Sequence, residues 1–236
     1  EDGKLFCDYF DVSEAGNFEN GKSILHVRGK PELCAERYSM SPELLAQKLT
    51  ELSARLLVVR SQRVRPFKDD KVLADWNGLM LSSLAKGYQI TGDKRYLEAA
   101  NGCANFLLDT MHSCEGLHRT YRQGTVGSHG LLSDYAFVCN GLIDLYEAGF
   151  ELEHLEFADR LADEMIEKFA DERGGFFQTL ADQDDLLVRQ KESYDGAVPS
   201  GNSVAALALS RLALLTGRDE HRRAASQTFA AFAGSV

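Results

Sequence analysis

The chain has 236 residues, 44% of them hydrophobic and 26% charged, a balance typical of a soluble globular protein large enough to bury a core. Its net charge of −10, without a basic run or a basic helix face, excludes nucleic acid as an expected partner. No stretch of 18 or more apolar residues occurs, so no membrane span is expected, and the first residues lack a signal-peptide pattern.

The first forty residues predict an irregular linker segment over 1–40, with a short strand-like run at Ser23–Val27 between glycine and asparagine turns. Ser41 is a good helix cap with Pro42 behind it, and leucines recur after it at helical spacing. We therefore expect a second, helical domain over 41–236.

From residue 73 onward the predicted helices alternate in character. Three are apolar on nearly every side and three carry a single apolar stripe; in chain order they cover 73–90, 94–111, 135–148, 155–170, 204–215 and 221–233. Because a helix that is apolar all round must be covered all round, each pair predicts a hairpin of one inner and one outer helix.

The links between these helices alternate as well. Inner-to-outer links are short, whereas the outer-to-inner links at 113–133 and 171–200 are long and contain glycine. Both long links hold strand-like pieces, and "GGFFQTLADQDDLLVRQ" over 174–190 predicts a β-hairpin.

A polar tripeptide stands at the start of each inner helix. When the hairpins are aligned, Asp75 falls opposite Asp134, and Asn77 falls opposite Asn202. "DWN", "DYA" and "GNS" thus occupy one place in three successive hairpins, and we expect them to meet at one end of the fold.

Repeated hairpins with buried inner helices predict an all-α fold, a partial (α/α) toroid with short β-hairpins in the long links. The chain supplies about three and a half hairpins of such a ring. It also starts without methionine and its last helix has no stop signal. We expect it to be part of a longer polypeptide that supplies the remaining hairpins.

The five cysteines are odd in number and form no C-x-x-C pair, which favours a reducing, cytoplasmic setting. The cluster "HSCEGLH", with His112, Cys114 and His118, matches no common zinc spacing. No metal site and no cofactor are predicted.

The gathered polar residues predict a carbohydrate or another small molecule as ligand. Aromatic faces stack on sugar rings, asparagine and arginine bind hydroxyls, and paired carboxylates perform acid–base chemistry. Helix N-termini add partial positive charge. We predict catalytic roles for Asp75, Asp134 and Asp195. The predicted substrate-binding residues are Asp70, Trp76, Asn77, Tyr121, Tyr135, Phe177, Ser200 and Asn202.

Each of these residues also has a structural explanation. Asp75 and Asp134 are suitable helix caps, each worth about 1 kcal/mol in that role. Trp76 suits a core, and Asn202 can bond to backbone instead of ligand. Capping does not explain Asp195, which lies five residues before the predicted cap Ser200.

Four motifs carry a resemblance to a known family: "RPFKDDKVLADWNGLM", "LLSDYA", "GGFFQT" and "DGAVPSGNSVAALAL". In this order they resemble the YyaL-type family, the spermatogenesis-associated thioredoxin-domain proteins. The resemblance implies a thioredoxin-like domain followed by a six-hairpin toroid similar to glycosidases and N-acylglucosamine epimerases. Because no C-x-x-C pair occurs here, we expect these 236 residues not to include the thioredoxin-like part. By this resemblance, the candidate pocket residues are the motif positions Asp70, Asp75, Trp76, Asn77, Asp134, Tyr135, Asp195, Ser200 and Asn202.

Three hypotheses for the function follow. The first is a carbohydrate-active enzyme, a glycoside hydrolase with carboxylates across one cavity or a sugar epimerase that uses His118 and His129. The second is a non-catalytic helical-repeat module that binds a protein or a glycan. The third is a scaffold that presents substrates to the thioredoxin-like domain.

Overall fold

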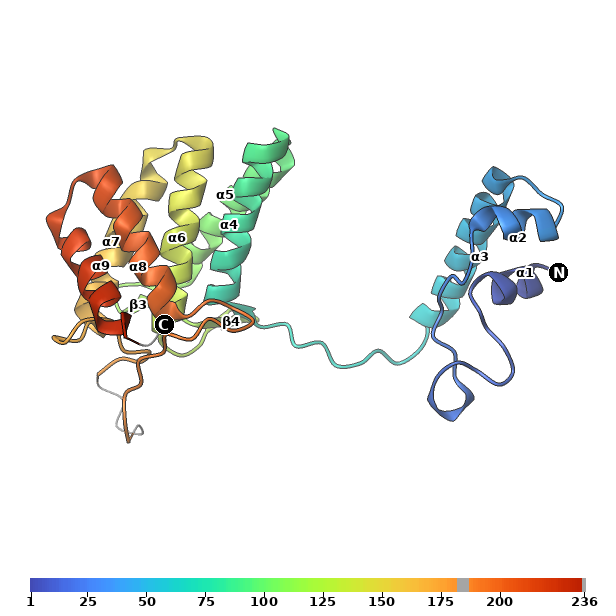
Figure 1. Ribbon diagram of the computed structural model, residues 1–236, viewed down its shortest axis with the longest axis horizontal. Coiled ribbons are helices and arrows are strands. Elements are labelled where there is room, and N and C mark those ends of the chain that lie inside the picture. The colour runs from blue at the N-terminus through green and yellow to red at the C-terminus, as the bar shows by residue number, and fades with distance from the viewer. Residues whose placement is uncertain (182–186, 235–236) are drawn as a thin grey trace. The chain divides into compact units, whose positions relative to one another are not determined.

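The computed structural model describes residues 1–181 and 187–234, which form two compact units, Glu1–Lys68 and Asp69–Val236 (Figure 1). Residue 68 is therefore the last of the first unit, whereas the sequence placed a boundary at residue 40. The reason lies in the helix that follows Ser41, because its apolar face packs within the first unit.

The first unit contains helices α1 (Asp2–Tyr9), α2 (Pro31–Arg37) and α3 (Pro42–Ser61), with a 3-10 turn at Glu19–Gly21. The expectation of an irregular segment over 1–40 was wrong in this respect, because α1 and α2 cover the leucine face of α3. The small core so formed contains Leu5, Phe6, Ala35, Leu45, Leu49 and Leu52. The predicted strand-like run at Ser23–Val27 is not a strand.

The described part of the second unit forms three helical hairpins side by side (Figure 1). They are α4 (Ala74–Thr91) with α5 (Lys94–Thr110), α6 (Leu132–Gly149) with α7 (Leu152–Phe169), and α8 (Gly201–Thr216) with α9 (Asp219–Phe232). Gly92 and Gly217 end α4 and α8 in the left-handed conformation, which glycine adopts without strain. The predicted alternation of inner and outer helices is confirmed.

Helix α6 lies between α4 and α8, and its close approach to α4 depends on glycine. A β-carbon at Gly78 would lie 2.5 Å from the carbonyl carbon of Phe137, and one at Gly141 would lie 2.7 Å from the carbonyl oxygen of Gly78. No real side chain fits at such distances, so these two glycines set the spacing of the inner helices.

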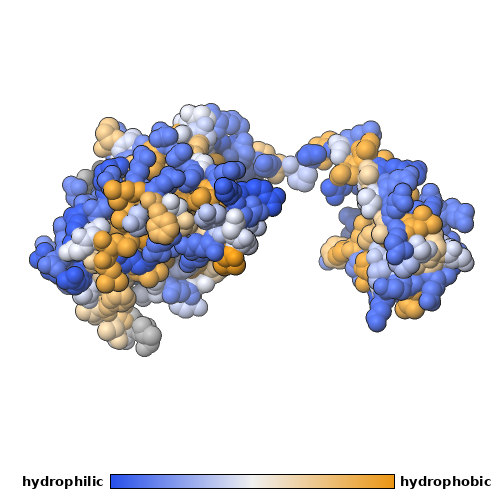
Figure 2. All heavy atoms as spheres, turned by 90° about the horizontal axis from the view of Figure 1, so that it is seen from above, coloured by the Kyte–Doolittle hydropathy of each residue, from blue (hydrophilic) through white to orange (hydrophobic). Residues whose placement is uncertain are grey.

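Of the inner helices in the described range, α6 is enclosed on nearly all sides, whereas α4 and α8 are not. Met80 and Ile90 on α4 are 55% and 84% exposed, and Leu214 on α8 is 85% exposed. The expectation of three enclosed helices is thus met by α6 alone within residues 69–181 and 187–234. Figure 2 shows apolar side chains among the polar ones on this unit's visible surface.

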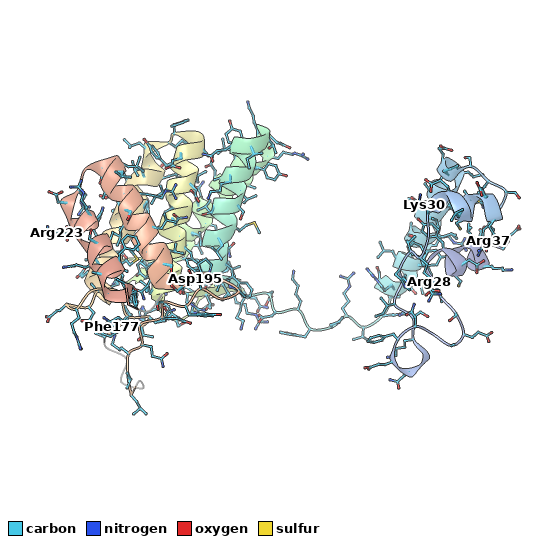
Figure 3. The ribbon with its side chains drawn as sticks, viewed as in Figure 1. Arg28, Lys30, Arg37, Phe177, Asp195 and Arg223 are labelled. Carbon is cyan, nitrogen blue, oxygen red and sulfur yellow. The ribbon has the colours of Figure 1, made fainter. Side chains whose placement is uncertain are left out.

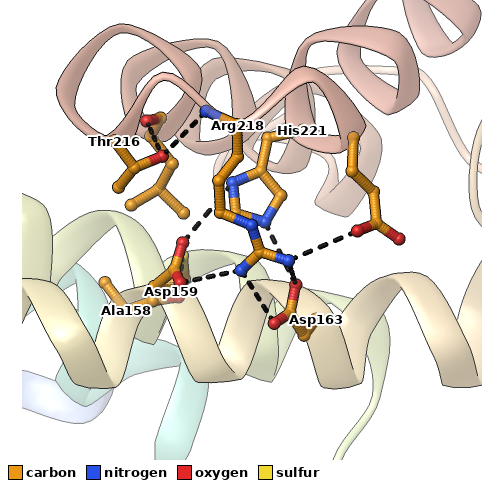
Figure 4. Close-up of polar contacts among 9 residues, drawn as sticks. Ala158, Asp159, Asp163, Thr216, Arg218 and His221 are labelled. Carbon is orange, nitrogen blue, oxygen red and sulfur yellow. Dashed lines mark hydrogen bonds and ion pairs between the residues drawn. The ribbon is translucent and has the colours of Figure 1, made fainter.

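The outer helices α7 and α9 are joined by a charged cluster (Figure 4). Arg218 forms ion pairs with Asp159 at 2.7 Å and with Asp163 at 2.8 Å, and buried His221 lies 3.2 Å from the same Asp163. The neighbouring carboxylates raise the pKa of Arg218, and its guanidinium helps to lower the pKa of Asp163 against the effect of burial.

The link between α5 and α6 holds short strands, as expected. Strands β2 (His112–Ser113) and β3 (Gly116–Leu117) form one pair, and β4 (Thr120–Arg122) pairs with β5 (Thr125–Val126). Strand β1 (Val72–Leu73), directly before α4, pairs with β4 as well. This pairing fixes the long link against the start of α4.

The predicted β-hairpin at 174–190 falls partly on residues 182–186, outside the described residues. In the part that is described, Ala170 and Phe176 form an isolated bridge, and the amide of Gln178 donates to the carbonyl of Gln190 at 2.8 Å. Residues 187–190 are not in a strand.

Candidate functional site

The N-termini of the three inner helices meet at a cavity of about 320 Å³. Asp75 comes from α4, Ser133 and Phe137 from α6, and Ser200 and Gly201 from the start of α8. The long links supply the other lining residues, namely Arg119, Gln178, Glu192, Tyr194 and 196–199. The predicted convergence of these helix starts is therefore observed.

Beneath the cavity lies the carboxylate of Asp134, which is fully buried and accepts three hydrogen bonds. The donors are the amide of Asp75 at 3.0 Å, the amide of Leu131 at 2.8 Å and Nη1 of Arg119 at 3.0 Å. The structural explanation made Asp134 the N-cap of α6, but the N-cap is Leu131, and Asp134 is the third residue of the helix, whose side chain accepts from the amide of the N-cap. The other two bonds go further, because they tie α4 and the preceding link to the same acid.

Burial raises the pKa of Asp134 to about 6, and the nearby carboxylate of Asp75 adds to this rise. The amide of Leu131, the charge of Arg119 and the amide of Asp75 act in the opposite direction, because they stabilise the carboxylate. Asp134 thus changes protonation state close to neutral pH while having no exposed surface of its own.

Arg119 connects the buried acid to the cavity. Its Nη2 lies 3.6 Å from Oδ2 of Asp75, while Nη1 bonds to Asp134. Its main chain is also fixed, because its carbonyl accepts from the amide of Ala74 at 2.9 Å and its amide donates to Ser128 at 2.8 Å. Sequence reasoning missed Arg119. The signal was its place in the strand-like piece "GLHRTYRQG", two residues before Tyr121, which was selected.

Asp75 is 7% exposed and lines the cavity, and its Oδ1 accepts from the amide of Trp76 at 2.8 Å. The N-cap of α4 is Leu73, so Asp75 is not the N-cap that the structural explanation expected; it lies in the first turn, accepts from the amide of Trp76 and lines the cavity. The structure brings Asp75 and Asp134 together, with Asp134 behind it.

Asp195 lies apart from them. Its Oδ1 accepts from the amide of Ser200 at 2.8 Å, and this bond lowers the pKa of Asp195. Its side chain lines a separate cavity of about 430 Å³ between α8 and α9, with Phe229 and Phe232. Figure 3 shows Asp195 and Phe177 at the end of the hairpins where the long links lie. The structure does not place Asp195 in the cavity of Asp75.

Two predicted ligand contacts are instead buried in the frame of the site. Asn202 accepts from the amide of Phe176 at 2.8 Å and donates to the carbonyls of Phe176 and Glu192. Tyr135 is 1% exposed, and its hydroxyl accepts from the amide of Leu117 at 2.8 Å. Both hold the long links against the inner helices, which is the backbone role that the alternative explanation gave to Asn202.

The remaining predicted residues on α4 and α8 differ in access. Trp76 is 63% exposed, directly beside Asp75. Asn77 bonds to the carbonyl of Leu73 in its own helix at 2.8 Å. The hydroxyl of Ser200 caps α8 by accepting from the amide of Ser203 at 3.1 Å, while its residue also lines the cavity.

The other predicted residues on the links have protein partners. Asp70 forms an ion pair with Arg122, which lowers the pKa of Asp70. The ring of Tyr121 packs edge-on against Phe106 with centroids 5.1 Å apart. These contacts stabilise the sheet β1–β4–β5, and neither Asp70 nor Tyr121 lines the cavity of Asp75.

Phe177 lies under two cations outside that cavity. The guanidinium of Arg189 is 4.1 Å from the ring centroid, and the ammonium of Lys191 is 5.2 Å from it. The histidine pair expected for an epimerase, His118 and His129, stacks with ring centroids 5.9 Å apart and does not line the cavity either.

Within residues 1–181 and 187–234, no three histidine, cysteine or acidic side chains are grouped so that they could hold a metal ion. Across the same residues, no helix has the length and apolar character needed to cross a membrane.

The sequence is similar to part of several known proteins. No family profile matches it. Spermatogenesis-associated protein 20 of Rattus norvegicus is 37% identical over 239 residues, which covers 92% of this chain and 30% of the relative. The human protein of the same name is 36% identical over the same share.

The chain is a relative of spermatogenesis-associated protein 20. The resemblance inferred from the four motifs is thereby confirmed. An uncharacterized protein of Caenorhabditis elegans is 31% identical over 95% of the chain and 33% of that relative. The chain thus spans about a third of the length of these curated relatives.

Solved structures show the same fold. A cellobiose 2-epimerase from Spirochaeta thermophila is 20% identical, with a TM-score of 0.57 over 70% of this chain and 43% of the epimerase. An inactive variant of an alpha-1,6-mannanase of Salegentibacter, in complex with alpha-1,6-mannotetrose, is 12% identical. Its TM-score is 0.57 over 99% of this chain and 68% of the mannanase. The fold is therefore that of the six-hairpin glycosidase-like (α/α) toroids, as predicted.

Proposed function

We propose that the cavity at the starts of α4, α6 and α8 binds a carbohydrate. The observation that carries this proposal is the pairing of Asp75 and Arg119 at its wall, with Glu192 on the facing link. A sugar hydroxyl donates to a carboxylate and accepts from a guanidinium, so one ring of hydroxyls satisfies both kinds of group. Hydroxyl-rich ligands are the class that this mixture suits.

The aromatic residues beside the cavity support the same class. Trp76 is exposed next to Asp75, and Tyr194 lines the cavity and is 78% exposed. Exposed aromatic rings of this kind are common where a ligand has an apolar face and a polar edge, as a sugar ring has. We propose Trp76 as the platform on which part of a longer glycan stacks.

The fold supports the choice of ligands to test. The solved structures with this fold include a cellobiose 2-epimerase, a D-mannose isomerase and the mannanase with bound mannotetrose. Their identity to this chain is 20% or less, so they indicate the fold and not the reaction.

Glycoside hydrolysis is a second candidate, favoured by a specific observation. Asp75 and Glu192 bring two carboxyl groups to one cavity, and hydrolysis of a glycosidic bond uses such a pair as acid and as base or nucleophile. In this proposal Asp134 does not touch the substrate, since it has no exposed surface.

Titration of the full chain with α-1,6-linked mannotetraose and with cellobiose tests the binding proposal. We expect at least one of them to bind, and Arg119→Gln to weaken that binding about tenfold or more, the loss of one charged hydrogen bond. Arg222→Gln is the matched control, because Arg222 is 61% exposed and pairs with Asp219 within α9. Binding that survives unchanged in Arg119→Gln contradicts the proposal.

Incubation of the same glycans with wild-type protein tests hydrolysis. Release of reducing ends that stops in both Asp75→Asn and Glu192→Gln, while the glycan still binds, supports the reaction. Binding without any product leaves the cavity as the site of a non-catalytic carbohydrate-binding module.

A further inference from the structure

At each of the three helix starts around the cavity, at least one backbone amide is bonded to a protein side chain. The amide of Asp75 in the first turn of α4 donates to Asp134, and the next amide donates to Asp75 itself. Asp134 also accepts from the amide of Leu131, the N-cap of α6, and Ser200 caps α8. Helix starts attract anions through free amides, and here the amides of Asp75, Trp76, Leu131 and Ser203 are bonded to side chains of the protein.

The charges around the cavity are mostly negative. Asp75 and Glu192 line it, and Asp134 lies directly behind the first of them. The cation that lines it, Arg119, contacts both aspartates and so is neutralised by them. The unit as a whole has 15 lysines and arginines against 26 aspartates and glutamates.

The cations nearest in sequence to these links serve elsewhere. Lys191 pairs with Asp171, and Arg189 donates to the carbonyl of Thr179 at 3.0 Å. Both line another cavity, together with Phe177. An anionic ligand in the cavity of Asp75 therefore meets a lining that contains two acidic residues, Asp75 and Glu192, and a guanidinium that is already paired.

We infer that this cavity selects uncharged sugars over anionic ones, and that Asp134 is the positioning residue that maintains the selection by holding Arg119. The inference rests on the proposed carbohydrate-binding function. Without Asp134, Arg119 would have a free edge for a carboxylate or a phosphate, and the cavity would lose one negative charge.

The test compares matched sugars that differ in charge. Binding of mannose and mannuronic acid, and of glucose and glucuronic acid, is measured by ligand-observed NMR at pH 7.5 with the full chain. We expect the wild-type protein to prefer the neutral member of each pair by about tenfold or more, the size expected for a net charge at short range.

Two variants locate the origin of that preference. Asp134→Asn should reduce the preference for the neutral sugar several-fold. It should also weaken the binding of the neutral sugar, because Arg119 loses its ion pair with residue 134. Glu192→Gln, an exposed change outside the buried cluster, should reduce the preference even if Asp134→Asn does not fold. Asp144→Asn is the control, since Asp144 is a buried acid on α6 that pairs with Arg211 at 2.8 Å away from the cavity.

The outcomes separate the two proposals. Equal affinity for both members of a pair, or an unchanged preference in Glu192→Gln, overturns the charge selection and leaves carbohydrate binding standing. A preference that changes as much in Asp144→Asn as in Asp134→Asn overturns the positioning role. If none of the sugars binds, the proposed function fails and this inference fails with it.

Discussion

The backbone amide of Asp75, in the first turn of α4, donates to the side chain of Asp134, in the first turn of α6, over 3.0 Å. Two inner helices therefore share one buried acid at the point where the candidate cavity opens. The same acid bonds to Arg119, so helix spacing and cavity chemistry depend on one carboxylate.

Removal of that carboxylate should destabilise the protein. Asp134→Ala leaves two amides and a guanidinium without their acceptor, and we expect a loss of about 3 kcal/mol or more in the free energy of unfolding. Chemical denaturation measures it. Asp219→Ala removes an exposed acid that pairs with Arg222 at a surface site, and it should cost less than about 0.5 kcal/mol. Similar losses in the two variants would contradict the structure.

Stability should also depend on pH through Asp134. Burial raises its pKa from an ordinary value of 3.8 to about 6, so the folded protein holds this proton more tightly than the unfolded chain does. The contribution of this bound proton to the free energy of unfolding is fully present below about pH 4. It falls by up to about 3 kcal/mol as the pH rises through about 6.

Other groups titrate over the same range, so the comparison is between wild type and Asp134→Asn. The wild-type free energy of unfolding should fall more steeply than that of the variant between about pH 4 and pH 6. If the free energies of unfolding of the two proteins changed in parallel with pH, the raised pKa of Asp134 would be contradicted.

Two glycines should respond in opposite ways to alanine. At Gly78 a β-carbon would lie 2.5 Å from the backbone of Phe137, so Gly78→Ala must force α4 away from α6. We expect a loss of about 2 kcal/mol or more. At Gly102, in the outer helix α5, a β-carbon meets nothing within 4 Å. Gly102→Ala should stabilise the protein by about 0.5–1 kcal/mol. Thermal unfolding measures the stability of both variants. If Gly78→Ala left the stability unchanged, the close spacing of α4 and α6 would be contradicted.

The cluster between α7 and α9 should contribute more than an ordinary surface ion pair. Arg218 contacts Asp159 and Asp163 in partly buried surroundings, and buried His221 lies 3.2 Å from the same Asp163. Arg218→Ala should cost about 1–2 kcal/mol, because two carboxylates then lose their cation. Arg222→Ala on the same helix should cost less than about 0.5 kcal/mol. If Arg218→Ala and Arg222→Ala lowered the free energy of unfolding equally in denaturant titration, the proposed contribution of Arg218 to joining α7 and α9 would be contradicted.

Much of the frame was predictable from periodicity. The apolar helices and the striped helices differ in how many faces they bury, and this difference is written directly into the spacing of their residues. The recurrence of Asp75, Asp134 and Asn202 at the helix starts was sufficient to predict that the three N-termini lie close together. The exposed flanks of α4 and α8 were not predictable in this way, because composition does not indicate which neighbours a helix has.

The site was harder to predict than the frame, for a physical reason. Whether a polar side chain faces a cavity or a backbone amide depends on loop paths that carry no periodicity. Tyr135 and Asn202 bond to the long links and not to open space. Arg119 reaches the cavity because β1 pairs with β4, where Leu73 lies opposite Thr120, a residue 47 positions later in the sequence. No local pattern indicates that pairing.

The enclosure of α6 has a consequence for motion. A helix covered by neighbours on nearly all sides opens to solvent only when those neighbours separate, so the amide hydrogens of α6 should exchange with deuterium more slowly than those of α4 and α8. The candidate cavity would then be built on a helix that exchanges more slowly than the two helices on either side of it.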